Sequence, residues 1–171
     1  AYEGGRPLHV ESLVLSTQHQ PWWSDRQGEL AEALAEYVLR PALGAWWHGG
    51  ILVHVNPGGP FCHGGPAADT GLTGRKIIVD TYGGWAPHGG GSFSGKDAAK
   101  VDRSASYMAR HIAKNLVAAG LAEQCEVHLS YAIGMPDPTS VAVDCAGTEV
   151  VDEAAIERLV REAFPLTPGG I

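Results

Sequence analysis

The sequence has few cysteines and too few basic residues to balance its acidic ones. Its three cysteines, Cys62, Cys125 and Cys145, form no metal-ligand spacing, and an odd count disfavours a disulfide framework. No apolar run is long enough to span a bilayer, and the first twelve residues (AYEGGRPLHVES) lack the charged start and apolar core of a signal peptide. Twelve Lys and Arg against 19 Asp and Glu leave a net charge of −7, which disfavours nonspecific nucleic-acid binding. These absences favour a cytoplasmic protein that acts on neither membranes nor nucleic acids.

Glycine and tryptophan are abundant instead, with 23 and five residues. Four of the tryptophans form two pairs, Trp22-Trp23 and Trp46-Trp47, on either side of the first expected helix. Paired aromatic residues usually belong to a core or an interface. Their other common use is the wall of a hydrophobic ligand pocket, and both readings stay open here.

The first 60 residues read as a β-α-β unit. The strands are expected at 9–16 and 51–55, and a helix at 27–40 with Ser24 as its N-cap and Pro41 as its end. The turn at 56–60 (NPGGP) is the most natural domain boundary. We therefore predict two units, 1–60 and 61–171.

The second unit is expected to begin with a strand at 76–82 and to continue through a glycine-rich loop into a helix that ends at Gly120. Val127, Leu129, Tyr131 and Ile133 alternate with polar residues, and Val141, Val143 and Cys145 follow after a turn, which predicts a β-hairpin. Asp152 then starts a last helix, with an inward face formed by Ile156, Leu159, Val160 and Phe164. The fold class is α+β, two β-α-β-type units forming sheets with helices on one face.

The segment from Gly71 to Ser104 (GLTGRKIIVDTYGGWAPHGGGSFSGKDAAKVDRS) carries the chemistry. Its glycines allow backbone N–H groups to approach a ligand closely, and the surrounding lysines and arginines suit an oligophosphate. Asp102, among these basic residues, could hold a divalent cation that bridges phosphate oxygens. The spacing differs from that of a Walker A loop.

As a whole string this segment resembles the S-adenosylmethionine synthetase (methionine adenosyltransferase) family. Residues 89–97 (GGGSFSGKD) fit the family's glycine-rich signature at every position, and GLTGRKIIVDTYGG before them is equally typical. The similarity extends to SYAIG at 130–134 and STQH at 16–19. It corresponds to the latter part of the family's central domain and most of its C-terminal domain. The family's His-Pro-Asp-Lys and GAGDQG motifs are absent from these 171 residues, so the resemblance implies a truncated synthetase.

The resemblance also implies roles for individual residues. Arg75, Lys76 and Lys96 would hold the triphosphate, and Asp69 and Lys100 would lie near methionine. Asp102 would be a magnesium ligand, and Phe61 matches the aromatic residue that stacks on adenine. His88 matches a histidine common in the family's loop; a general acid–base role is open to it, and so is a hydrogen bond that fixes the loop. The implied cofactors are Mg²⁺ and K⁺.

Departures from the family pattern gather near the expected nucleotide site. Pro60 and Pro87 stand where the family has basic residues, and Trp85 replaces a smaller apolar residue. Cys62 and His63 replace an apolar pair; neighbours on an extended segment point apart, which disfavours a joint metal site.

Two functions follow from these observations. In one, the chain forms part of an adenosyltransferase that joins ATP and methionine, and either a partner chain supplies the missing motifs or the chain is an excised fragment. In the other, a repurposed scaffold binds a hydrophobic small molecule and catalyses a cyclisation or isomerisation in a biosynthetic pathway, or serves as a non-catalytic subunit, without a cofactor. In both we expect a homo-oligomer, most simply a dimer, because a sheet with helices on one face leaves its other face to be covered.

Overall fold

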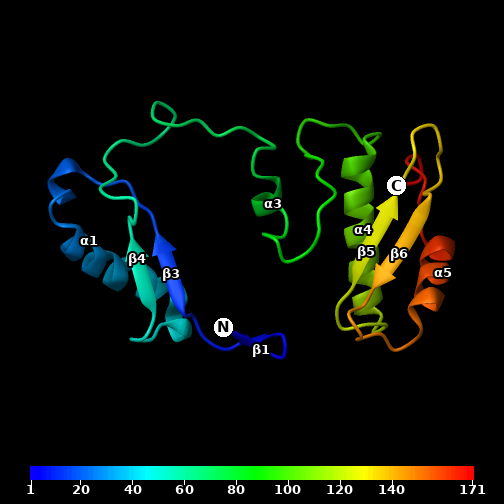
Figure 1. Cartoon of the computed structure of the whole chain (residues 1–171), viewed down its shortest axis with the longest axis horizontal. Helices are drawn as coiled ribbons and strands as arrows, with labels where there is room; N and C mark the ends of the chain where they lie inside the picture. The colour runs from blue at the N-terminus through cyan, green and yellow to red at the C-terminus, as the bar shows by residue number, and fades with distance from the viewer. The chain divides into compact units, whose positions relative to one another are not determined.

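The computed structural model describes all 171 residues and divides them into two compact units, Ala1–Gly71 and Leu72–Ile171 (Figure 1). No helix is both long enough and apolar enough to cross a membrane. The fold is α+β as expected, with small two-stranded sheets and helices packed beside them.

The first unit contains the predicted β-α-β arrangement. A short hairpin, β1 (Tyr2–Glu3) and β2 (Arg6–Pro7), precedes it. Strand β3 (Ser12–Leu15) pairs in parallel with β4 (Leu52–Val55), in a register that sets Leu13 opposite Val53. Between them lie the 3-10 turn η1 (Pro21–Trp23), helix α1 (Gln27–Leu34), the π-helical turn η2 (Ala35–Leu39), helix α2 (Arg40–Leu43) and the 3-10 turn η3 (Gly44–Trp46). Leu30 and Leu39 are the buried apolar residues of this helical run.

The expected start of this helix at Gln27 is confirmed, but its expected cap and its expected end were wrong. The helix begins at Gln27 after Arg26 rather than at a Ser24 cap, because Ser24 belongs to the turn of η1, where its N–H donates to the carbonyl of Pro21. The helix also continues past Pro41. Pro41 lacks the backbone N–H that an α-helix would use at this position. The π-helical turn η2 before it shifts the backbone hydrogen bonds by one residue, and the helix then continues through α2 to Leu43.

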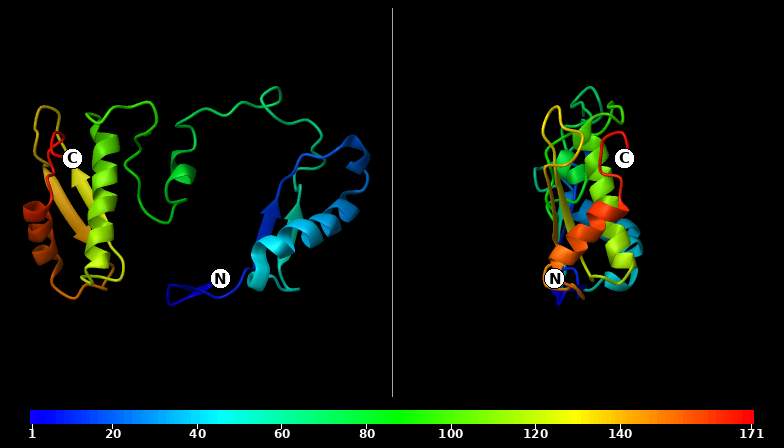
Figure 2. Two further views of the ribbon diagram at one scale, coloured as in Figure 1. Left: turned by 180° about the vertical axis from the view of Figure 1, so that it is seen from behind. Right: turned by 90° about the vertical axis from the view of Figure 1, so that its right-hand side faces the viewer.

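The second unit is built on a hairpin covered by two helices. Strands β5 (Glu126–Ser130) and β6 (Ser140–Asp144) are antiparallel, with Val127 opposite Val143. Helix α4 (Val101–Ala118) packs on β5 and α5 (Glu153–Ala163) packs on β6, and both lie on the same face of the hairpin (Figure 2). The core lies between these layers and is formed by Met108, Ile112, Leu116, Val141, Val143, Cys145, Ile156, Val160 and Leu166.

Helix α4 ends as predicted. Gly120 has a φ of 73°, the N–H of Leu121 bonds to the carbonyl of Leu116, and the N–H of Gly120 bonds to that of Val117. This pair of bonds is a Schellman motif, which needs a left-handed residue at the glycine position.

The strand expected at 76–82 was wrong. Residues Ile77–Asp80 form a single helical turn, α3, and Gly83 follows with a φ of 61°. A strand must pair its backbone groups with a neighbouring strand. This segment instead satisfies them locally, with bonds from the N–H of Asp80 to the carbonyl of Lys76 and from the N–H of Gly83 to that of Ile78.

The inward faces differ from the prediction at two positions. Ile133 lies beyond the end of β5 in the turn and is fully exposed, and Leu159 is 43% exposed. The buried stripe of α5 is narrower than expected and rests on Ile156 and Val160.

Candidate functional site

The glycine-rich loop of the second unit folds onto the first turn of α4. A Cβ atom added to Gly91 would lie 2.3 Å from the Cβ of Asp102, so only glycine fits at this contact. The guanidinium of Arg103 donates a hydrogen bond to the carbonyl of Lys96, which ties the far end of the loop to the same helix. The loop and the start of α4 therefore form one connected structure.

A second close contact joins the loop to the segment before α3. Gly74, with a φ of 79°, lies so near Ser92 that a Cβ added to it would be 2.9 Å from the serine Cβ. Arg75 and Lys76 follow Gly74 directly, and both are exposed. The Nζ of Lys76 donates to the carbonyl of Arg75.

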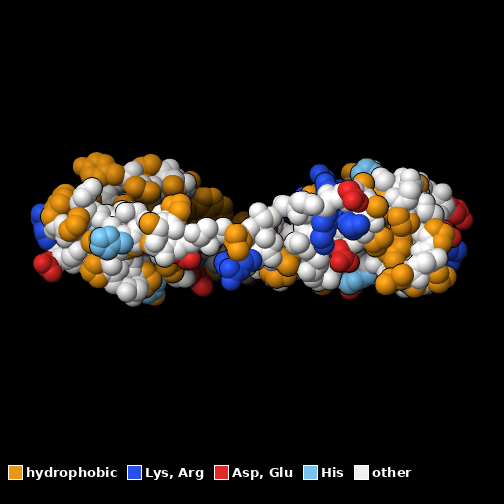
Figure 3. All heavy atoms as spheres, turned by 90° about the horizontal axis from the view of Figure 1, so that it is seen from above, with side chains coloured by type: hydrophobic (Ala, Val, Ile, Leu, Met, Phe, Trp, Pro, Cys, Tyr) orange, Lys and Arg blue, Asp and Glu red, His pale blue; other side chains and the backbone are white.

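The start of α4 combines an unused helix end with positive side chains. Lys100 occupies the N-cap position without a side-chain capping bond, so the first N–H groups of α4 keep their partial positive charge. Lys96 is half-buried and Lys100 is exposed. Seen from above, Lys and Arg side chains gather with acidic ones over the part of this unit where the loop meets α4 (Figure 3). Such an arrangement attracts anions.

Asp102 lies in the first turn of α4 with an exposed side chain. Its carboxylate forms no ion pair, while its backbone carbonyl accepts a bond from the hydroxyl of Ser106. One free carboxylate beside an oligophosphate is the usual protein contribution to a magnesium site. The residue therefore fits the ligand role that the resemblance implies.

His88 fixes the loop through one of its ring nitrogens. Nδ1 accepts a hydrogen bond from the N–H of Gly90 at 2.7 Å, which leaves the proton on Nε2. Nε2 is buried without a hydrogen-bond partner. The ring packs against Phe93, and Phe93 against Tyr107, with centroid distances of 5.5 and 5.3 Å. His88 thus has a structural contact on one side and an unused donor on the other.

A groove of about 1290 Å³ runs along α4 and β5 beneath the loop. Its lining includes Trp85, Pro87, His88, Asp102 and Arg110. The Arg110 guanidinium donates to the Tyr82 hydroxyl at 3.1 Å and lies over that ring. Of the predicted site residues, His88 and Asp102 line the groove, whereas Arg75, Lys76, Lys96 and Lys100 are outside its lining.

Phe61 and Asp69 belong to the first unit. Phe61 is held by the histidine of the STQH string: its N–H donates to Nε2 of His19, and its carbonyl accepts from the N–H of His19. The side chain of Phe61 is 38% exposed, and Asp69 is exposed after a turn closed on the carbonyl of Gly65.

The tryptophans of the first unit lie near its surface. The rings of Trp22 and Trp23 stack with centroids 4.3 Å apart, and the guanidinium of Arg26 lies over both. Trp22 is 57% exposed, so this pair forms no core within the unit. The Sγ of Cys62 lies 3.3 Å from the Oγ of Ser24 and 3.7 Å from the Nδ1 of His19.

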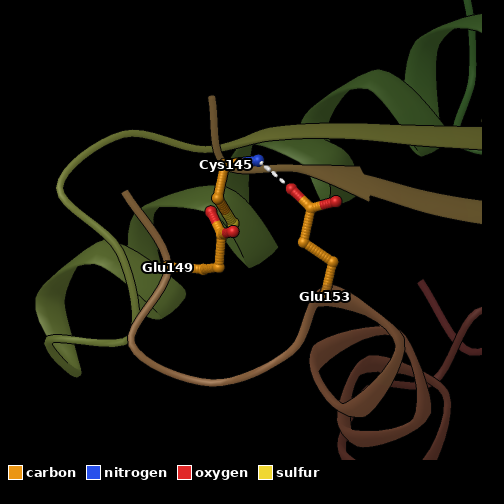
Figure 4. A group of neighbouring side chains, drawn as sticks. All are labelled: Cys145, Glu149 and Glu153. Carbon is orange, nitrogen blue, oxygen red and sulfur yellow. Dashed lines mark hydrogen bonds between the residues drawn. The ribbon is translucent and has the colours of Figure 1, made fainter. Parts of the chain in front are cut away.

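One group of potential ligands was missed by the sequence reasoning. Cys145, Glu149 and Glu153 offer ligand atoms that all lie within 4.8 Å of one another (Figure 4). The only signal in the sequence is the four-residue spacing of the three side chains, which span a strand end, a loop and a helix start.

Comparison with known families agrees with the resemblance. The sequence model for the C-terminal domain of S-adenosylmethionine synthetase matches residues 63–171. The chain belongs to the S-adenosylmethionine synthetase family. The match contains the glycine-rich loop, all of α4, the hairpin and α5, so the connected loop-and-helix structure lies within the synthetase domain.

Proposed function

We propose that the glycine-rich loop and the start of α4 bind the triphosphate part of ATP, in the reaction that forms S-adenosylmethionine from ATP and methionine. The observation that carries this proposal is the close contact of Gly91 with Asp102, which sets the loop backbone against the helix end. The contact of Gly74 with Ser92 supports it, because it joins the segment that carries Arg75 and Lys76 to the same loop.

The chemistry required of this region is electrostatic. In the transfer, the methionine sulfur attacks C5′ of the ribose and triphosphate leaves with its negative charge. Loop N–H groups, the first N–H groups of α4 and the ammonium groups of Lys96 and Lys100 would stabilise that charge where it develops. Mg²⁺, when bound at Asp102, would neutralise further phosphate charge.

A direct test is calorimetric titration of the chain with inorganic triphosphate in the presence of Mg²⁺. A charge-assisted hydrogen bond contributes about 1.5–3 kcal/mol, so Lys96→Ala and Lys100→Ala should each weaken binding by roughly 10- to 100-fold. Arg158→Ala, on the exposed face of α5, removes the same charge elsewhere and should leave binding unchanged. Equal affinities for all four proteins would refute the proposal.

A second function is favoured by one observation. Trp85 and Pro87, two of the departures from the family pattern, both line the groove beside α4. An apolar wall with a few polar groups is typical of small-molecule sites. Under this alternative the groove holds an aromatic or aliphatic metabolite for a cyclisation or isomerisation.

The fluorescent aromatic anion 8-anilinonaphthalene-1-sulfonate is a suitable probe for this alternative. Trp85→Ala should then reduce probe binding by roughly two- to tenfold, since an aromatic contact contributes roughly 0.5–1.5 kcal/mol beyond its buried area. Trp22→Ala, in the first unit, is the matched control. Equal binding by both variants would leave the alternative without support.

A further inference from the structure

Arg103, in the first turn of α4, is bound to the backbone of the glycine-rich loop rather than to a carboxylate. Its Nη1 donates a hydrogen bond to the carbonyl of Lys96, seven residues earlier in the chain. The side chain is half-buried, and no ion pair in the structure includes it. A carbonyl has no net charge, so it fixes the guanidinium without neutralising it. Arg103 therefore keeps its positive charge beside the loop.

Two carboxylates lie close to Arg103 in the sequence, and neither neutralises it. The carboxylate of Asp97 accepts a hydrogen bond at 2.9 Å from the backbone N–H two residues later, and so supports the turn into α4. The carboxylate of Asp102 forms no ion pair. Lys96 and Lys100 have no carboxylate partner either. The charges of all three basic side chains are therefore available to an anion.

The hydrogen bond from Arg103 also fixes the backbone that carries the Lys96 side chain. Gly95, directly before Lys96, has a φ of 77°, a left-handed conformation that favours glycine. Glycine is the most flexible residue of the backbone, so the peptide after it is free to turn unless another group holds it. The Arg103 side chain holds the carbonyl of that next residue. The Lys96 ammonium group is thereby presented from a fixed position.

We propose that Arg103 is a positioning residue for the triphosphate, which holds Lys96 in place through its carbonyl and adds its own uncompensated charge. The inference rests on the proposed binding of triphosphate by the loop. A lysine on a fixed backbone loses less conformational freedom on binding than one on a mobile loop. Lys100 does not depend on the Arg103 side chain, because its carbonyl accepts bonds from the backbone N–H groups of Arg103 and Ser104 in α4.

The test is a double-mutant cycle in which calorimetry measures the affinity of the full chain for inorganic triphosphate with Mg²⁺. Arg103→Met removes the donor and the charge but keeps an unbranched side chain, and it should weaken binding roughly tenfold. In the Arg103→Met chain, Lys96→Ala should weaken binding by no more than about threefold further, because the lysine is no longer held in place. Lys100→Ala is the matched control and should weaken binding by the same factor with and without Arg103→Met.

Arg103→Lys keeps the charge and one donor group, so it should recover part of the affinity and part of the dependence on Lys96. The Lys100→Ala comparison also reports whether the start of α4 is intact in each variant. Equal losses from Lys96→Ala in the unmodified and the Arg103→Met chain would overturn this inference and leave triphosphate binding itself in place. Absence of triphosphate binding in the unmodified chain would refute the proposed function, and this inference with it.

Discussion

The contact between Gly91 and Asp102 can be tested with a pair of substitutions in the same loop. In Gly91→Ala the new methyl would lie 2.3 Å from the Cβ and 2.9 Å from the Cγ of Asp102. Carbon atoms in contact prefer about 3.5–4.0 Å, so the loop or the helix must move by roughly 1 Å. Gly89→Ala meets no atom within 4 Å and is the matched control. Neither glycine has a positive φ, so both substitutions change packing without backbone strain.

Overpacking of this kind costs about 1–3 kcal/mol, whereas Gly89→Ala should change stability by no more than about 0.5 kcal/mol. In a unit of this size, each kcal/mol lowers the melting temperature by roughly 4–8 °C. Thermal unfolding followed by circular dichroism measures the difference. Because the loop moves away from α4, triphosphate binding should also weaken in Gly91→Ala, by roughly tenfold, and stay unchanged in the control. Equal melting temperatures for the two variants would show that the loop does not rest on α4, and the site described above would be refuted.

Three further predictions concern stability, assembly and activity. Because folding raises the pKa of Cys125 from 9.0 to about 12, the Cys125 thiol loses its proton at lower pH in the unfolded chain, and the free energy of unfolding should fall as pH rises between these values. We expect this fall to be about 1–2 kcal/mol after allowance for partial exposure. Denaturant unfolding measures it and should show a smaller fall in Cys125→Ser. Val14 and Leu52 are 63% and 60% exposed on the outer face of the β3–β4 pair, and we expect a second copy of the chain to cover this apolar face. Light scattering should therefore detect a dimer that Val14→Glu dissociates. A stable monomer at micromolar concentration would contradict this. In an assay with ATP, methionine, Mg²⁺ and K⁺, these 171 residues alone should form little S-adenosylmethionine, because the positioning of both substrates needs the family's His-Pro-Asp-Lys motif. Turnover like that of a complete synthetase would refute this prediction.

The elements that the sequence predicted well are those specified by local patterns. Strict alternation at 126–133 and at 141–145 predicted the hairpin, whose strands in the structure are Glu126–Ser130 and Ser140–Asp144. The apolar stripe of α4 together with Gly120 predicted a helix and its end. The segment 76–82 has a β-type composition, yet it forms a helical turn, because a strand depends on a distant partner that composition does not reveal.

The candidate site divides in the same way. The string at 89–97 indicated the loop, but the contact of Gly91 with Asp102 depends on how the chain folds back. The cluster around Cys145 was not predictable, since its members come together only through the hairpin register and the turn before α5.

The most direct test of the central claim is to map triphosphate binding by NMR. In a titration with inorganic triphosphate and Mg²⁺, we predict that the amide signals of residues 89–97 and of the first turn of α4 shift together with a single affinity, and that the signals of α5 do not move. Shifts confined to other parts of the chain, or no shifts at millimolar triphosphate, would contradict the claim that the glycine-rich loop binds the triphosphate.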